Sequence, residues 1–198
     1  EGNISEDKID NLIVSYYAEN NYEKLKEKLE MWEKAPFLKE RMPIIKSCLY
    51  ATDKIDGEIL FNMAIPTLLA QEDGILEDMY NLIPEDTRFD IAQSDHLNSN
   101  QTKNIITSYL WYNGYGAIAI YVLKVLVQKT FLNGKTGITK LSQEELEKYN
   151  KFRNKILHGD KNYLKYGTLK NYIQSWLELE LLFYSYMAIF NTTQKNIP

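Results

Sequence analysis

One arginine and one histidine in the C-terminal third of the chain are of types suited to phosphoryl chemistry. Arg153 and His158 lie five residues apart in the segment KFRNKILHGD. A guanidinium binds and neutralises a phosphate, and an imidazole, which titrates at about pH 6.5, moves protons near neutral pH. Residues five apart on a straight helix lie about 140° from each other, so the two side chains share a face only if the backbone bends, for which Gly159 offers a place. The pair indicates phosphoryl chemistry without a metal, and the alternative is that Arg153 pairs with an acidic side chain while His158 caps a helix end.

The Arg/His pair lies in the basic part of a chain that is acidic elsewhere. Residues 124–170 hold 11 Lys and Arg against 4 Asp and Glu, a net charge of +7, whereas the rest holds 12 against 23, a net charge of −11. Interleaved basic and aromatic residues are typical of surfaces that bind phosphates and stack on the bases of single-stranded RNA. A solvated surface with structural tyrosines is the alternative. The RNA-binding candidates are Lys151, Lys155, Lys161, Tyr163, Lys165 and Tyr166.

Composition narrows the possible chemistry. The 198 residues carry a net charge of −4 and include one cysteine and two histidines. An internal disulfide and a Cys/His zinc site are excluded, and no cofactor is expected. A single cysteine leads us to expect a reducing, cytoplasmic location. The longest apolar stretch is far shorter than the roughly 20 residues of a membrane-spanning helix, so we expect no membrane partner. The chain starts at Glu1 without a methionine, which indicates a processed protein or a piece of a longer one.

Helical periodicity predicts the elements that must position the pair. Many tyrosines, few glycines and prolines, and no alternating strand pattern favour an all-α, up-and-down helical bundle. Two short amphipathic helices are predicted in residues 5–34, with a turn at Asn20 and Asn21. A third helix is predicted over residues 37–52, with Ile44 on its inner face.

Longer helices are predicted in the second half of the bundle. A helix over residues 58–82 is followed by a polar, irregular stretch over 84–100. Residues 102–131 form the most apolar stretch, for which we expect one central, buried helix that includes Tyr112. A final helix is predicted over residues 168–190.

Two segments of the chain, in this order, resemble those of one family. IPTLLAQEDG occupies residues 65–74, and RNKILHG at 153–159 is followed by KYGT at 165–168 and a leucine-rich helix. These segments are similar to those of HEPN domains, all-α bundles in which an arginine, a polar residue and a histidine a few positions on mark many prokaryotic ribonucleases and toxins. The resemblance covers about residues 37–190.

The resemblance implies roles for individual residues. It assigns Arg153 and His158 to catalysis and Asn154 to the polar position after the arginine. Asp73 stands where related sequences often have glutamate, which implies an acidic role for it. HEPN ribonucleases typically form dimers in which two Arg/His motifs face one cleft, so one histidine can act as base and the other as acid. The implied activity is metal-independent cleavage of RNA.

The resemblance also implies a domain organisation and partners. Residues 1–36 lie outside it and are predicted to form an N-terminal helical extension, and residues 37–198 are predicted to form the HEPN-like domain with its four-helix core. The expected partners are RNA and a second copy of the chain, with an antitoxin or a missing N-terminal domain as further candidates. The alternative function is a non-catalytic HEPN module that binds RNA or a nucleotide, or that mediates dimerisation.

Overall fold

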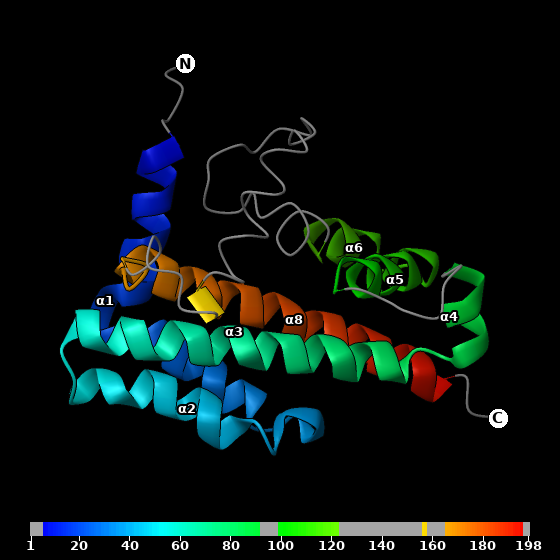
Figure 1. Cartoon of the computed structure of the whole chain (residues 1–198), viewed down its shortest axis with the longest axis horizontal. Coiled ribbons are helices and arrows are strands. Elements are labelled where there is room, and N and C mark those ends of the chain that lie inside the picture. Colours follow the sequence, from blue (N-terminus) through cyan, green and yellow to red (C-terminus); the bar gives the residue numbers. More distant parts are fainter. Residues whose placement is uncertain (1–5, 92–98, 123–155, 158–164, 196–198) are drawn as a thin grey trace. The chain divides into compact units, whose positions relative to one another are not determined.

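The protein is an all-α helical bundle, as its sequence predicts. The computed structural model describes residues 6–91, 99–122, 156–157 and 165–195. Every regular element among these residues is helical (Figure 1). In chain order the elements are α1 (Glu6–Trp32), η1 (Pro36–Leu38), α2 (Met42–Tyr50), η2 (Ala51–Asp53), α3 (Gly57–Leu82), α4 (Glu85–Ile91), α5 (Ser99–Tyr112), α6 (Gly116–Val122) and α8 (Leu169–Lys195).

The chain divides into two compact units, each with its own core. Unit 1 comprises Glu1–Gln71 and Thr130–Leu177, and unit 2 comprises Glu72–Lys129 and Glu178–Pro198. The long helices α3 and α8 therefore contribute residues to both units. The predicted division at residue 36 stays a prediction.

The core of unit 1 is built around aromatic side chains from α1, α3 and α8. Tyr172 of α8 is fully buried, and its ring lies 4.9 Å from that of Phe61 and 5.7 Å from that of Tyr22, centroid to centroid. Its hydroxyl donates a hydrogen bond of 2.9 Å to the backbone carbonyl of Cys48 in α2. One turn later, Trp176 stacks on Trp32 of α1 at 6.3 Å. These contacts hold the start of α8 against α1, α2 and α3, because large buried rings contribute most of the apolar area of such a core.

The core of unit 2 combines apolar side chains with three buried ionisable ones. Residues of α3, α5, α6 and α8 supply its apolar part, which includes Ile75, Met79, Ile106, Leu110, Val122, Leu182 and Ile189. Glu72, Lys103 and Glu178 are buried in the same unit, from three different helices. Ionised groups are rarely found inside a protein without partners.

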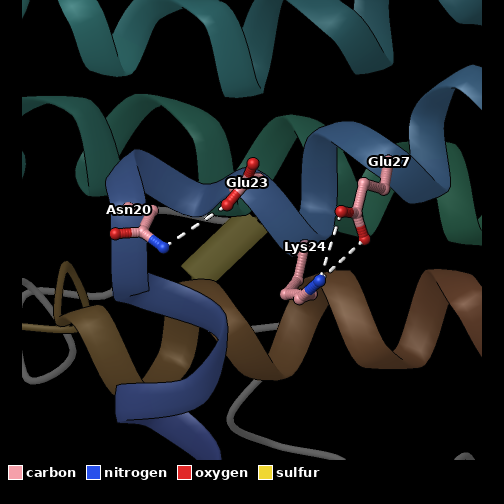
Figure 2. A network of polar contacts seen from close by, with 4 residues as sticks. All are labelled: Asn20, Glu23, Lys24 and Glu27. Atoms are coloured by element: carbon pink, nitrogen blue, oxygen red, sulfur yellow. Dashed lines mark hydrogen bonds and ion pairs between the residues drawn. The ribbon is translucent and has the colours of Figure 1, made fainter.

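The predicted turn in the N-terminal segment is confirmed. Glu19 has an extended backbone, and Asn20, Asn21 and Tyr22 have φ values of 50°, 55° and 60°, so α1 breaks there into two halves that run in different directions (Figure 1, Figure 2). Asn20 donates to Glu23 at 3.4 Å, and in the second half Lys24 pairs with Glu27 (Figure 2). Asparagine adopts this left-handed conformation more readily than most residues, which explains the position of the break.

The helix predicted over residues 37–52 is divided, and the assignment of Ile44 to its inner face is wrong. Two short 3-10 helices flank α2, whose first turn contains Pro43 as expected. The buried face of α2 consists of Met42, Ile45, Cys48 and Leu49, and Ile44 is 44% exposed. Successive helix residues point about 100° apart, so burial of Ile45 turns its neighbour outward.

The single central helix predicted over residues 102–131 is also wrong in its described part. Gly114, with φ at 85°, ends α5, and α6 starts at Gly116. The N–H of Gly114 donates to the carbonyl of Trp111, and the N–H of Tyr115 donates to that of Leu110, which is the Schellman pattern of a helix end. Tyr112, expected in the core, is 80% exposed. Residues 123–131 lie outside the described residues.

The described parts of the stretch 84–100, residues 84–91 and 99–100, are more regular than the sequence predicts. α4 starts directly after Pro84, whose carbonyl accepts a hydrogen bond from the N–H of Arg88, and α5 starts at Ser99. The guanidinium of Arg88 lies 4.9 Å from the ring centroid of Tyr80, which ties α4 to the end of α3. Helices α3 and α8, by contrast, occupy nearly the ranges that were predicted for them.

Candidate functional site

The described part of the candidate site consists of two short segments of unit 1, residues 156–157 and 165–168. Arg153, Asn154 and His158 lie outside the described residues. The same holds for four of the RNA-binding candidates, which are Lys151, Lys155, Lys161 and Tyr163. The described residues therefore show only the segments that flank the Arg/His pair in the sequence.

The centre of the RNKILHG segment has helical backbone and one buried side chain. Ile156 is 5% exposed and belongs to the apolar core of unit 1, whereas the adjacent Leu157 is exposed. Burial of Ile156 anchors the chain midway between Arg153 and His158.

The KYGT segment is fastened to α3 on one side and to α8 on the other. The hydroxyl of Tyr166 donates to the backbone carbonyl of Asn62 in α3 at 2.8 Å. The carbonyl of Tyr166 accepts a hydrogen bond of 2.8 Å from the side-chain amide of Asn171. The hydroxyl oxygen of Thr168 accepts from the N–H of Asn171 at 3.2 Å, as an N-cap residue does at the third position of a helix. These bonds define where α8 starts.

Gly167 permits the close approach of this segment to α3. A Cβ atom at Gly167 would lie 2.2 Å from Oδ1 of Asn62, far inside the contact distance. The glycine of KYGT thus allows this close packing, since a larger residue would have to displace the Asn62 side chain.

Two RNA-binding candidates fall within the described residues, and they lie in different environments. Lys165 is exposed, as a phosphate-binding residue must be. Tyr166 is half-buried, and burial raises the pKa of its phenol, which stays a neutral donor to Asn62. Its hydroxyl positions the segment, while stacking of its ring on an RNA base stays a prediction.

An ion pair that sequence reasoning missed lies two residues beyond the KYGT segment. The carboxylate of Asp10 in α1 lies 2.5 Å from Nζ of Lys170 in the first turn of α8. Asp10 is buried, and Lys170 is partly exposed. Residues 160 positions apart in sequence form this pair. No local pattern could have predicted it, although the polar Asp10 on a helix face was a signal of some buried partner.

Asp73, which the resemblance assigns an acidic role, is exposed in unit 2. The residue before it, Glu72, is buried in that unit. Helical spacing could have indicated this, because Glu72 follows Leu68 and Leu69 and precedes Ile75 at intervals of three and four residues. Glu72 is therefore the carboxylate of the IPTLLAQEDG segment that interior packing holds in place.

Packing and hydrogen bonds hold the described residues on both sides of residues 158–164. Ile156 on one side and the hydrogen bonds of Tyr166 and Thr168 on the other hold the two ends of the stretch that contains His158. Such a support is what a catalytic group needs to keep its position. Lys165 adds an exposed positive charge to the KYGT segment, whereas the charge of Lys170 is paired with Asp10.

Comparisons with known proteins leave the family of the chain open. No family model, no curated protein and no solved structure matches the chain. Among the described residues, none of the helices has both the length and the apolar character needed to cross a lipid bilayer.

Proposed function

We propose that the protein is a metal-independent endoribonuclease of the HEPN type that acts as a homodimer in the cytoplasm, in phage defence or as a toxin. One observation carries the proposal: Arg153 and His158 occur at the spacing of the HEPN motif within a zone of net charge +7. The KYGT segment supports it, because its hydrogen bonds to α3 and α8 fix the chain shortly after the motif in the sequence.

The proposed reaction is an in-line transesterification. Nε2 or Nδ1 of one His158 removes the proton of a ribose 2'-hydroxyl, and the 2'-oxygen forms a bond to the adjacent phosphorus. The bond from phosphorus to the 5'-oxygen breaks, and the His158 of the second protomer gives that oxygen a proton. Both Arg153 guanidinium groups stabilise the charge on the phosphorane. The products are a 2',3'-cyclic phosphate and a free 5'-hydroxyl.

RNA cleavage by matched histidine variants tests the proposal. The substrate is a labelled single-stranded RNA in buffer with EDTA. We expect His158→Ala to lower the cleavage rate by about 10²-fold or more, because general acid and base catalysis contribute about that much. His96→Ala removes the only other histidine of the chain and should leave the rate unchanged.

Two outcomes of this assay contradict the proposal. Undiminished cleavage by His158→Ala would show that the histidine has no catalytic role. Cleavage that stops in EDTA and returns with a divalent cation would show a metal-dependent reaction.

The Arg153→Lys variant keeps the positive charge but loses the paired hydrogen bonds to phosphate, so it should also cleave RNA more slowly than the wild type.

A non-catalytic module that binds RNA is the second candidate function. The net charge of −4 and the use of the Tyr166 hydroxyl within the protein favour it. This candidate predicts binding to RNA that weakens with salt, with no cleavage under any condition.

If Arg153 only closes the bundle, Arg153→Ala should lower the melting temperature, whereas a catalytic arginine can be removed at little cost in stability.

A further inference from the structure

The first half of α1 places a buried carboxylate on a lysine of the basic zone. Asp10 has a side chain only 7% exposed, and its carboxylate lies 2.5 Å from Nζ of Lys170. Lys170 is the last basic residue of the zone 124–170. A carboxylate and an RNA phosphate offer a lysine the same kind of anionic oxygen.

Lys170 lies in the helix turn that directly follows two of the predicted RNA-binding residues, Lys165 and Tyr166. Thr168 caps the helix turn that carries Lys170, and Asn171 donates to the carbonyl of Tyr166. Lys165 is exposed just before this turn. Lys165, Tyr166 and Lys170 thus belong to one hydrogen-bonded corner of unit 1.

The helix half that carries Asp10 buries little of its apolar surface. Leu12 is 61% and Tyr16 is 51% exposed, whereas Leu25 and Leu29 in the second half of α1 are buried in the core. Apolar burial is the main force that fixes a helix to its neighbours. The first half is therefore held less firmly than the second.

A strained turn connects the two halves. Asn20, Asn21 and Tyr22 all have left-handed backbone, which is unfavourable for most residues other than glycine and asparagine and thus strains Tyr22 above all. The turn is held by hydrogen bonds from Asn20 to Glu23 and from Asn21 to Asp53. A continuous helix through residues 19–22 would remove the strain and point the first half in another direction. Residues 19–22 are therefore a candidate hinge, because a change in their backbone would reorient the first half of α1.

We infer that residues 6–18 form an autoinhibitory arm and that Lys170 is a phosphate-binding residue of the RNA site. In the arm, the carboxylate of Asp10 binds Lys170 in the place of an RNA phosphate. The inference rests on the proposed function, since it assigns that site a regulator within the same chain. RNA binds when a phosphate replaces the Asp10 carboxylate and the arm swings away about residues 19–22. The arm lowers the apparent affinity for RNA by the fraction of molecules in which it is closed.

Salt-dependent binding of single-stranded RNA to an arm variant tests the inference. All measurements use His158→Ala protein, so that the RNA stays intact. Asp10→Asn should bind up to about fivefold more tightly, the upper end for an ion pair of this exposure. The slope of log K against log salt should become steeper by about 0.7, the value for one further phosphate contact on a single strand.

Two controls separate the arm from general charge effects. Glu30→Gln removes the same charge from an exposed position in the second half of α1, and should leave the salt slope unchanged. Lys170→Met combined with Asp10→Asn should abolish the gain of the single Asp10→Asn variant, because the freed lysine is then missing.

Each outcome separates this inference from the proposed function. Equal affinity and slope for Asp10→Asn and its parent, in a protein whose wild type cleaves RNA, overturn the arm and leave the ribonuclease. Tighter binding by Asp10→Asn in a protein that never cleaves RNA supports the arm and overturns the ribonuclease. Absence of RNA binding by every variant overturns both.

Discussion

Single residues account for the way in which the chain around the candidate site is fastened. Gly167 lets the KYGT segment touch Asn62, Tyr166 bonds the backbone of α3, and Thr168 caps α8. Tyr172 joins three helices through its ring and its hydroxyl. The candidate catalytic residues are identified by their types and spacing in the sequence, whereas the residues near them in the chain are positioned by packing.

The contact between Gly167 and Asn62 predicts a specific coupling. Gly167→Ala places a methyl group on the Asn62 side chain, which must rotate away, and we expect a loss of about 1 kcal/mol in the free energy of unfolding. In an Asn62→Ala background, Gly167→Ala should lower the free energy of unfolding only slightly, because the side chain that it displaces is missing. Denaturant unfolding of the four proteins of this cycle measures the coupling, and independent costs would show that the two residues are not in contact.

The buried thiol of Cys48 predicts a loss of stability at high pH. Burial raises the pKa of Cys48 from 9.0 to about 11. Between these values the unfolded chain has lost the thiol proton and the folded chain keeps it, so the free energy of unfolding falls as the pH rises. The slope approaches about 1.4 kcal/mol per pH unit.

Cys48→Ala removes this contribution and serves as the comparison. The difference in unfolding free energy between wild type and Cys48→Ala should shift by about 2 kcal/mol, to the disadvantage of the wild type, from about pH 8 to about pH 11. Denaturant titrations at several pH values check this. Parallel pH profiles would contradict the assigned burial.

At the scale of elements, helical periodicity predicted the helices well and their interruptions unevenly. The turn at Asn20 and Asn21 and the extents of α3 and α8 followed from apolar spacing and turn residues. The break at Gly114 was missed, because apolar residues continue on both sides of it and one glycine is a weak signal. The exposure of Tyr112 is a consequence of that break.

The left-handed turn within α1 predicts opposite effects for two substitutions at one position. Asn20→Gly relieves backbone strain and should raise the free energy of unfolding by about 0.5 kcal/mol, whereas Asn20→Ala should lower it by about 1 kcal/mol. Both remove the bond to Glu23, so the difference between them reports the backbone alone. Thermal or denaturant unfolding that ranks alanine equal to or above glycine would contradict the left-handed turn.

At the scale of the whole molecule, the uneven charge distribution is what the sequence predicts most clearly about function. The basic zone and the Arg/His motif could be identified without any structure. The pairing of Asp10 with Lys170 and the burial of Glu72 depend on how helices pack, and Asp10 and Lys170 are too distant in sequence for spacing to connect them. The sequence thus indicates the candidate chemistry of the Arg/His pair, and the packing of the helices shows which charged side chains are paired or buried.

A catalytic dimer predicts how activity responds to mixing. If each active site needs two His158 side chains, a mixed dimer with one His158→Ala protomer is inactive. Equal amounts of wild type and variant, unfolded and refolded together, should give about half the activity of the same amount of wild type refolded alone, because half of the wild-type chains then have a variant partner. Unchanged activity would indicate that one protomer forms a complete site.

The end groups of the cleaved RNA test the central claim most directly. A defined RNA oligonucleotide is incubated with wild type and with His158→Ala in EDTA, and the products are identified by mass spectrometry. The account predicts fragments with a 2',3'-cyclic phosphate and a 5'-hydroxyl from the wild type, and intact RNA from the variant. Fragments with a 5'-phosphate, or the same fragments from both proteins, would contradict it.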